Sequence, residues 1–380
     1  MKKVVVLGAG MVGRVIAADL SKNFDVTAVD KNLAGLDWLK KSFTVKTLGA
    51  DLSDQSAVSQ AISDADLVIS AVPGFMGFQT LKTIIQSGKN VVDISFFGED
   101  AFELDDLARS KNVIAVVDCG VAPGMGNIIL GHFSTQMKIN KFECMVGGLP
   151  SVRRFPFEYK APFSPVDVIE EYTRPARYVE NGNIIVKPAL SDPELVFFEE
   201  VGTLEAFNTD GLRSLIKTMN IADMKEKTLR YPGHIRLIES LREAGFFSKE
   251  CQTINGIQVS PFDFTSKILY NCWKLEDIDP EFTIMRVEIW GEEEERSVKV
   301  EYNLFDQRDP VSGFSSMSRT TGFTCTAVAN MVIDGLYKRK GISPPEYVGM
   351  ADGCHEFAVR YLLERNVVWK ESRGRQEKQI

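Results

Sequence analysis

Residues 4–13 of the chain read Val-Val-Val-Leu-Gly-Ala-Gly-Met-Val-Gly. An apolar run leads directly into three glycines with the spacing G-x-G-x-x-G, and an amphipathic stretch follows. Gly8 permits a tight turn, Gly10 lets the backbone approach a pyrophosphate, and Gly13 lets a helix pack closely on a strand. The pyrophosphate would accept hydrogen bonds from the start of that helix, at Gly10, Met11 and Val12. The stretch therefore predicts the strand, turn and helix that open a dinucleotide-binding domain.

Similar apolar runs recur at intervals of about twenty residues through the first part of the chain. They are Val4–Leu7, Val26–Val29, Val45–Leu48, Leu67–Ser70, Val91–Ile94 and Val113–Val117. Short continuous apolar runs are typical of strands buried on both faces, and amphipathic stretches between them favour a parallel sheet with helical crossovers. We predict an α/β fold, in which residues 1–122 form a Rossmann-type doubly wound parallel sheet.

The second run ends at Asp30, where a carboxylate would bond the ribose hydroxyls of an adenosine and repel a 2′-phosphate. We therefore expect NAD as the cofactor. Lys31 follows directly, and its ammonium would instead attract a 2′-phosphate. After the third run, Asp51 and Leu52 are placed near the expected adenine. Asp51 either bonds the adenine edge or caps the next helix, and the sequence leaves both readings open.

Small and polar residues follow the fourth, fifth and sixth runs. In a doubly wound sheet the carboxyl ends of these strands face the nicotinamide half of the cofactor. Small residues and a proline turn would let a flat ring lie against the backbone, and carboxylates would supply polar groups beside it. The residues concerned are Ser70, Ala71, Val72, Pro73, Asp93, Ser95, Phe96 and Asp118.

The pattern changes after the glycine- and proline-rich stretch at residues 120–127. Asn181-Gly182 lies between Ala176–Glu180 and Asn183–Val186, which is a strong hairpin signal. Thr283–Trp290 alternates apolar and polar residues, as an antiparallel strand does, and the same alternation returns in residues 298–304 after a turn at residues 291–295, which predicts a second hairpin. We expect residues 123–313 to form an inserted α+β substrate-binding and dimerisation domain with antiparallel strands. Residues 314–380 are expected to be C-terminal helices that return to the Rossmann domain.

Composition excludes several classes of protein. The chain has 44 basic and 52 acidic residues, a net charge of −8, which disfavours nucleic-acid binding. No apolar run approaches the ~20 residues that cross a bilayer, and the N-terminus lacks a signal-peptide cleavage pattern. The six cysteines are scattered, as in a reducing cytoplasm. The three histidines are far apart in the sequence, so we expect no metal site.

Several motifs together resemble the saccharopine dehydrogenase family over essentially the whole chain. They are Gly8–Gly13 with Asp30, Ala71–Phe75, Asp93–Phe96, Gly120–Gly124 and Thr228–His234. Four runs are most similar to the lysine 6-dehydrogenase-like branch of this family, namely Pro73–Phe75, Ile169–Arg177, Asp210–Ser214 and Phe314–Arg319. One departure supports that branch. Enzymes that handle saccharopine carry an aspartate before the Pro-Gly turn, whereas this chain has Ala122.

The resemblance implies NAD-dependent oxidation of L-lysine at its ε-amine by a homodimer. The semialdehyde product would cyclise to 1-piperideine-6-carboxylate. Arg213 and Arg230 would clamp the substrate carboxylate, since guanidinium groups bind carboxylates bidentately, although either arginine could instead hold loops through salt bridges. Asp93 or Asp118 would hold the ε-ammonium, and His234 or a water molecule would take its proton. Ser95, Phe96 and Tyr231 complete the expected substrate site.

Two other functions are compatible with the sequence. A saccharopine or carboxynorspermidine dehydrogenase would form a secondary amine by reductive condensation on the same fold. A nucleotide-binding regulatory protein would keep the Rossmann domain without turnover. Retention of Arg213, Arg230 and His234 favours an enzyme, because a sensor would not need them.

Overall fold

The computed structural model describes residues 1–162, 165–276 and 278–375. Its contacts divide the chain into two compact units. Unit 1 comprises Met1–Met137 and Met317–Trp369, and unit 2 comprises Lys138–Ser316 with the chain from Lys370 onward. The sequence placed the boundaries after residues 122 and 313. The first boundary lies later, after Met137, because helix α6 (Met125–Ser134) packs against α12 (Pro345–Gly349) within unit 1.

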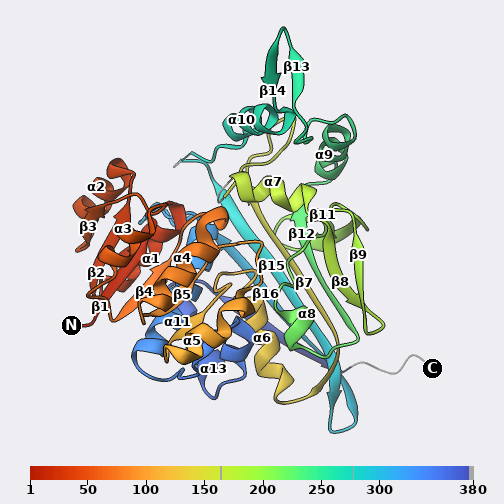
Figure 1. The fold of residues 1–380 in the computed structure, drawn as a ribbon. Coiled ribbons are helices and arrows are strands. Elements are labelled where there is room, and N and C mark those ends of the chain that lie inside the picture. Colours follow the sequence, from red (N-terminus) through yellow and green to blue (C-terminus); the bar gives the residue numbers. More distant parts are fainter. Residues whose placement is uncertain (163–164, 277, 376–380) are drawn as a thin grey trace. The chain divides into compact units, whose positions relative to one another are not determined.

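Unit 1 contains a seven-stranded parallel sheet with the strand order β17-β6-β5-β4-β1-β2-β3 (Figure 1). Six of these strands coincide with the six apolar runs, so the prediction of a doubly wound parallel sheet is confirmed. The seventh, β17, was not anticipated. The strands are β1 (Lys3–Leu7), β2 (Asp25–Asp30), β3 (Lys46–Gly49), β4 (Leu67–Ser70), β5 (Asn90–Asp93), β6 (Ile114–Val116) and β17 (Gly341–Ser343).

Helices cover the sheet of unit 1. Val5 and Leu7 of β1 belong to a buried cluster that includes Val58, Leu81 and Ala108 from three of the helices. The helices are α1 (Met11–Leu20), α2 (Leu33–Ser42), α3 (Gln55–Ala61), α4 (Gly74–Gln86), the short 3-10 helix η1 (Ala101–Leu104), α5 (Asp105–Ser110), α6, α11 (Ser316–Ile333), α12 and α13 (Cys354–Leu363). Of the C-terminal segment expected to return to the first domain, helices α11, α12 and α13 lie in unit 1, whereas residues 370–375 at its end belong to unit 2.

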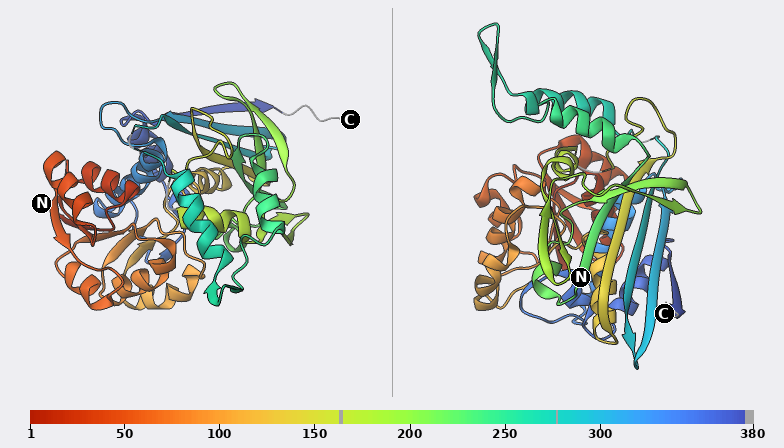
Figure 2. Two further views of the ribbon diagram at one scale, coloured as in Figure 1. Left: turned by 90° about the horizontal axis from the view of Figure 1, so that it is seen from above. Right: turned by 90° about the vertical axis from the view of Figure 1, so that its right-hand side faces the viewer.

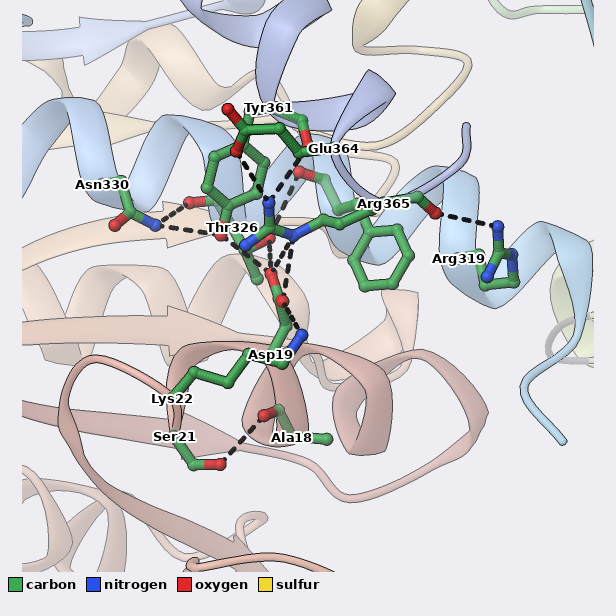
Figure 3. Close-up of polar contacts among 11 residues, drawn as sticks. Ala18, Asp19, Ser21, Lys22, Arg319, Thr326, Asn330, Tyr361, Glu364 and Arg365 are labelled. Atoms are coloured by element: carbon green, nitrogen blue, oxygen red, sulfur yellow. Dashed lines mark hydrogen bonds and ion pairs between the residues drawn. The ribbon is translucent and has the colours of Figure 1, made fainter. Parts of the chain in front are cut away.

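One buried carboxylate ties the first helix to these returning helices (Figure 3). Asp19 of α1 is 2% exposed and accepts hydrogen bonds from Thr326 Oγ1 and Tyr361 OH, both at 2.8 Å. The Arg365 Nε atom lies 2.9 and 2.8 Å from its two oxygens. Burial raises the pKa of Asp19, but the hydrogen bond and charge of Arg365 and the two hydroxyl groups outweigh burial and lower it. Asp19 therefore stays ionised and holds α1 against the C-terminal segment.

Unit 2 is built on a nine-stranded mixed sheet with the main order β10-β11-β12-β7-β15-β16-β18, to which the hairpin β8–β9 is attached through β12 (Figure 1). The predicted hairpins β8–β9 and β15–β16 are confirmed. Most neighbouring strands of this sheet are antiparallel, as the sequence predicted, whereas β12 pairs with β7 in parallel. The strands are β7 (Lys138–Pro150), β8 (Ala176–Glu180), β9 (Asn183–Lys187), β10 (Glu194–Phe198), β11 (Gly202–Asn208), β12 (Asp223–Arg230), β15 (Glu281–Glu293), β16 (Arg296–Gln307) and β18 (Trp369–Arg375).

The second core lies between this sheet and the helices of unit 2. Trp273 is fully buried there, with Tyr172 and Phe207 in the same cluster. A small hairpin, β13 (Gln252–Ile254) with β14 (Ile257–Val259), extends beyond α10 in Figure 2. The helices of unit 2 are α7 (Pro165–Thr173), α8 (Leu215–Thr218), α9 (His234–Glu243) and α10 (Pro261–Trp273). Within the described ranges, no helix of either unit has both the length and the apolar character needed to cross a bilayer.

Candidate functional site

The glycine turn between β1 and α1 has two positions that must be glycine for steric reasons and one that faces open space. Gly8 has a φ of 99°, and a Cβ there would lie 2.4 Å from the carbonyl oxygen of Ala71. A Cβ on Gly13 would lie 2.1 Å from the carbonyl oxygen of Gly8. A Cβ on Gly10, by contrast, would meet no atom within 4 Å. Gly8 and Gly13 therefore close the turn, and Gly10 leaves room beside the helix N-terminus.

Asp30 is held against this turn by two backbone groups. Its Oδ2 accepts a hydrogen bond of 2.7 Å from Ala9 N–H, and its Oδ1 accepts one of 2.8 Å from Asn32 N–H. Asn32 in turn caps α2 by accepting from Gly35 N–H. The carboxylate is therefore fixed at the carboxyl end of β2, next to the glycine turn, and retains acceptor capacity for a hydroxyl donor.

These features fit the binding of a dinucleotide. The first turn of α1 carries no acidic side chain, and no side chain caps its N-terminus. Because a helix N-terminus favours negative charge, the space beside Gly10 suits a pyrophosphate. Met11 and Val12 are half-buried at this end of the helix. The glycine turn and Asp30 thus form a preorganised cradle within unit 1.

The structure shows a local role for Asp51. Its Oδ1 accepts from both the N–H and the hydroxyl of Ser53, at 3.0 and 2.8 Å. These hydrogen bonds, followed in effect by the charge of Lys31, lower the pKa of this exposed carboxyl. The residue that caps α3 is Asp54, not Asp51. Leu52 is buried in the core of unit 1, so only its backbone could face a ligand.

Three polar side chains meet at the carboxyl ends of β4 and β5. Ser95 donates its N–H to Asp93 Oδ1 at 2.8 Å, and its hydroxyl lies 3.3 Å from Asp93 Oδ2. The hydroxyls of Ser70 and Ser95 lie 3.4 Å apart. Gly77 of α4 allows this close packing, since a Cβ there would lie 2.6 Å from the Cβ of Ser95.

Asp93 has an unusual protonation equilibrium. Its side chain is completely buried, and this burial raises its pKa to about 7, an effect that hydrogen bonds from Ser70 and Ser95 only partly offset. The negative charge of Asp118 also contributes to this raised value. Asp93 therefore exchanges a proton close to neutral pH, as a group that acts in general acid–base chemistry does.

Asp118 follows β6 with a φ of 53°, a conformation that is uncommon for residues other than glycine. The next residue, Cys119, is fully buried and donates its N–H to the carbonyl oxygen of Asp93 at 2.9 Å. Burial raises the pKa of the Cys119 thiol, with Asp93 and Asp118 adding to the effect. Cys119 is therefore protonated and packs beside the two aspartates. The structure thus brings Asp93, Asp118, Ser70 and Ser95 together, as the strand-end pattern suggested.

The other residues expected at the carboxyl ends of these strands differ in their exposure. Val72 is 5% exposed and belongs to the core of unit 1, so its side chain packs inward. Ala71 and Phe96 are half-buried, and Pro73 is exposed at the start of α4. Pro73, Ala71 and Phe96 therefore retain surface that a ligand could contact.

In unit 2, Arg230 lies inside an aromatic cluster. It is 3% exposed and donates from Nε to Tyr172 OH at 2.9 Å and from one terminal nitrogen to Glu171 at 2.8 Å. Its guanidinium carbon lies 4.4 Å from the ring centre of Tyr159. The Leu229 carbonyl oxygen accepts a further hydrogen bond of 2.9 Å. Protein groups thus occupy most of the donors of Arg230, and its part in a substrate clamp stays a prediction.

His234 belongs to the same cluster. One ring nitrogen lies 3.0 Å from Tyr172 OH and the other 2.9 Å from the carbonyl oxygen of Phe157. Burial, followed by the charge of Arg230, lowers the pKa of His234 to about 3. The imidazole is therefore neutral at physiological pH, which suits a hydrogen-bonding role better than that of a proton acceptor.

Arg213 is half-buried and has a φ of 45°. It follows β11, whose last residue Asn208 pairs with Lys227, whereas Arg230 pairs with Glu205 at the other end of this ladder. The chain after Asn208 passes beside Glu226, since a Cβ on Gly211 would lie 2.0 Å from that carboxyl group. The structure therefore does not bring the two arginines to one point.

Tyr231 donates its hydroxyl to the carbonyl oxygen of Pro150 at 2.9 Å, which is a structural contact. Sequence reasoning missed the partners of Arg230, namely Tyr159, Glu171 and Tyr172. They come from separate segments, and the only signal in the sequence was the Ile169–Arg177 run, which contains Glu171 and Tyr172.

Comparisons with known proteins identify the family. Residues 4–116 match the model of the saccharopine dehydrogenase NADP binding domain, and residues 120–362 match that of the saccharopine dehydrogenase C-terminal domain. A solved structure of saccharopine dehydrogenase (L-Glu forming) from Saccharomyces cerevisiae has a TM-score of 0.81 at 19% identity, covering 98% of this chain and 100% of that chain.

Two curated relatives differ in how much of their own length this chain spans. Mitochondrial alpha-aminoadipic semialdehyde synthase of Mus musculus is 23% identical over 90% of this chain, which spans 45% of that protein. Carboxyaminopropylagmatine dehydrogenase of Synechocystis is 22% identical over 90% of this chain and 92% of its own length. The chain thus spans about half the length of the first of these relatives. The two family models match in order, the first over the glycine turn and most of the parallel sheet and the second over the rest of the fold. The chain therefore belongs to the saccharopine dehydrogenase family.

Proposed function

We propose that the protein is an NAD-dependent dehydrogenase that oxidises the ε-amine of L-lysine. The observation that carries this proposal is the pair of buried carboxyl groups, Asp93 and Asp118, at the carboxyl edge of the nucleotide-binding sheet. Oxidation of an amine needs a negative group that attracts the ammonium and a group that accepts its proton. The assignment to lysine rests on the motifs shared with the lysine 6-dehydrogenase-like branch and on Ala122 in the Pro-Gly turn.

A pyridine nucleotide is the cofactor that the family and the glycine turn support. When bound, its nicotinamide ring supplies the hydride acceptor. We propose a preference for NAD because Asp30 is fixed beside the turn by Ala9 and Asn32, where its charge would repel a 2′-phosphate. The matched domain model and several relatives are named for NADP, and the exposed Lys31 adjoins Asp30. Comparison of kcat/KM for the two cofactors therefore tests this step separately.

The two aspartates at the carboxyl edge of the sheet have distinct proposed roles. Asp118 attracts the ε-ammonium, and Asp93, with a pKa of about 7, accepts the proton that the nitrogen must lose. The nitrogen lone pair then forms the C=N bond as the ε-carbon gives up its hydride. Water adds to this imine and releases ammonia, and the resulting aldehyde condenses with the α-amine to give 1-piperideine-6-carboxylate.

For the substrate carboxylate we propose Arg213 as the first candidate. Its side chain is half-buried, and guanidinium groups bind carboxylates with two parallel hydrogen bonds. We propose that Arg230, which is enclosed by Glu171 and two tyrosines, positions the aromatic cluster around His234. Replacing Arg213 by Ala would then raise KM for the amine with little change in cofactor affinity, whereas Arg230→Ala would lower stability first.

A second candidate function follows from the relatives. Those named saccharopine dehydrogenase and carboxyaminopropylagmatine dehydrogenase suggest reductive condensation of an amine with a carbonyl compound, as a carboxynorspermidine dehydrogenase would also perform. A nucleotide-binding protein without turnover is the third alternative. Incubation of the purified protein with NAD and L-lysine, L-ornithine, saccharopine or carboxynorspermidine distinguishes all three. Reduction of NAD by lysine alone supports the proposal, reduction by a secondary amine supports condensation chemistry, and cofactor binding without turnover supports the third.

A further inference from the structure

We propose that His132, His355 and Glu356 form a binding site for a divalent transition-metal ion in unit 1. His132 lies in the last turn of α6, and His355 and Glu356 lie in the first turn of α13. One potential ligand atom from each of the three side chains lies within 4.8 Å of the other two. Two of the three histidines of the chain, 223 residues apart in the sequence, thus meet beside a carboxylate.

The distances are close to those of a metal site. His132 Nδ1 lies 3.7 Å from Glu356 Oε1, and His355 Nδ1 lies 4.0 Å from the same oxygen. Zn²⁺ binds nitrogen and oxygen ligands at about 2.0–2.2 Å, so two ligands of a tetrahedral site lie roughly 3.3–3.5 Å apart. The three groups therefore need to approach one another by a few tenths of an ångström along these two edges.

The two imidazole rings also need to turn. They are stacked, with centroids 4.0 Å apart and planes at 16°. An ion bound by a ring nitrogen lies near the plane of that ring, so parallel rings cannot both face the same ion. Coordination would open the stack by rotation of the side chains. The exposed Glu356 side chain and the partly exposed His132 side chain, at 60% and 16%, leave room for this movement.

The donor set selects the class of ion. Imidazole nitrogens suit zinc, copper, nickel and cobalt, whereas magnesium and calcium prefer sites made only of oxygen. Two imidazoles and one carboxylate leave a fourth position for water. Gln136 contacts one of the two histidines. The side-chain amide nitrogen of Gln136 lies 2.8 Å from His132 Nε2. With the amide turned over so that its oxygen faces the ring, Gln136 would accept the Nε2 proton and leave Nδ1 free to bind an ion.

A bound ion would clamp α6 to α13. Both helices belong to unit 1, but the whole of the main segment of unit 2 lies between them in the sequence. Because an ion that binds only the folded state stabilises it by mass action, Zn²⁺ should raise the temperature of unfolding. The clamp would act on the structure of unit 1 and requires no part in the amine oxidation.

The test is a titration of the chelator-treated protein with Zn²⁺, followed by calorimetry and by thermal unfolding. We expect one ion per chain at this site and a higher unfolding temperature. Glu356→Gln should weaken Zn²⁺ binding on the order of 100-fold or more, since loss of a group that only hydrogen-bonds to a metal ligand already costs roughly 10–100-fold. Gln136→Ala should show that smaller loss. Glu364→Gln, which removes a carboxylate just beyond the end of the same helix, is the matched control and should bind as the wild type does.

Equal Zn²⁺ affinity in Glu356→Gln and the wild type would overturn the proposal. The ion would then lie elsewhere, for example at the exposed thiols of Cys251 and Cys272. The double variant Cys251→Ser, Cys272→Ser removes these two thiols. If the proposed site is correct, this variant should still bind Zn²⁺ as the wild type does. Absence of binding at millimolar Zn²⁺ in a folded protein would also contradict the site. Because Glu356 is exposed, its replacement by Gln should leave the fold intact.

Discussion

The glycine turn allows a prediction that separates cofactor binding from folding. Adding a methyl group at Gly10 and at Gly13 should have opposite consequences. A Cβ at Gly10 meets no atom within 4 Å, whereas a Cβ at Gly13 lies 2.1 Å from the carbonyl oxygen of Gly8. Gly10→Ala therefore places its methyl group in the space proposed for the pyrophosphate, and Gly13→Ala places one inside the backbone of the turn.

The expected changes in stability follow from these positions. Gly10 caps α1 with a φ of −70°, which alanine adopts without strain. Alanine is a poorer cap, by about 0.5–1 kcal/mol, but it lowers the entropy of the unfolded chain by a similar amount, so the free energy of unfolding should barely change. Gly13→Ala gains about 1 kcal/mol of helix propensity against an overlap that costs about 3 kcal/mol or more. A net loss of about 2 kcal/mol or more is expected.

For cofactor affinity the order of the two variants should be reversed, so that Gly10→Ala has the larger effect relative to its effect on stability. Loss of one charge-assisted hydrogen bond between the helix N-terminus and a phosphate costs about 1.5–3 kcal/mol, which raises Kd roughly 10–150-fold. Urea unfolding gives the stabilities, and NADH fluorescence gives the affinities. A Gly10→Ala protein that binds the cofactor as tightly as the wild type would refute the assignment of this space to the pyrophosphate. Equal stability of the two variants would refute the steric argument.

Three further changes test other parts of the molecule. Asp30→Ala should reduce the preference for NAD over NADP, measured as the ratio of the two kcat/KM values; an unchanged ratio would assign selectivity elsewhere. Asp93→Asn should lower kcat on the order of 10²–10⁴-fold as a lost proton acceptor. It should also raise the free energy of unfolding at pH 8. Because folding raises the pKa of Asp93 to about 7, most of this buried carboxyl is ionised at pH 8 at a cost to the folded state, and Asn removes that cost. Asp19→Asn should destabilise the fold by roughly 3 kcal/mol, because it removes the buried carboxylate that pairs with Arg365. Since the pKa of Asp19 is lowered on folding, the stability difference between this variant and the wild type should be constant above about pH 5 and shrink in acid. Lys22→Ala, which removes an exposed partner of Asp19, should change the free energy of unfolding little.

Much of unit 1 could be predicted from sequence because its strands are buried on both faces. Such strands appear as continuous apolar runs, and the glycine motif fixes where the first one ends. Strand β17 escaped prediction because it is only three residues long and pairs with β6, more than two hundred residues earlier in the chain. Nothing local in Gly341–Ser343 indicates that pairing.

Unit 2 was less predictable because charged residues lie inside its sheet. Strand β12 contains Glu226 and Lys227, which are 7% and 5% exposed, so its sequence resembles a surface segment. Lys227 can be buried because two carboxylates pair with it, Glu143 of the neighbouring strand β7 and Glu194 of β10. The hairpins were found from their local signals, Asn181-Gly182 and the alternation in β15, which do not depend on distant partners.

The candidate site shows the same division. Asp93, Asp118 and Ser95 could be placed from the sequence, because the carboxyl ends of parallel strands share one edge of the sheet. The pKa of Asp93 could not, because it depends on complete burial. The surroundings of Arg230 and the meeting of His132 with His355 depend on tertiary contacts between distant segments, which no spacing in the sequence reveals.

The measurement that tests the central claim most directly is the fate of the ε-nitrogen of lysine. The purified protein is incubated with NAD and L-lysine that carries ¹⁵N only at the ε-position, and the products are analysed by NMR and mass spectrometry. Oxidation at the ε-carbon predicts release of ¹⁵N-ammonia in equal amount to NADH, with an unlabelled cyclic imine whose carboxylate lies on a saturated carbon. Retention of ¹⁵N in a ring whose carboxylate lies on the C=N carbon, or the absence of NADH from lysine at any pH, would contradict the proposed function.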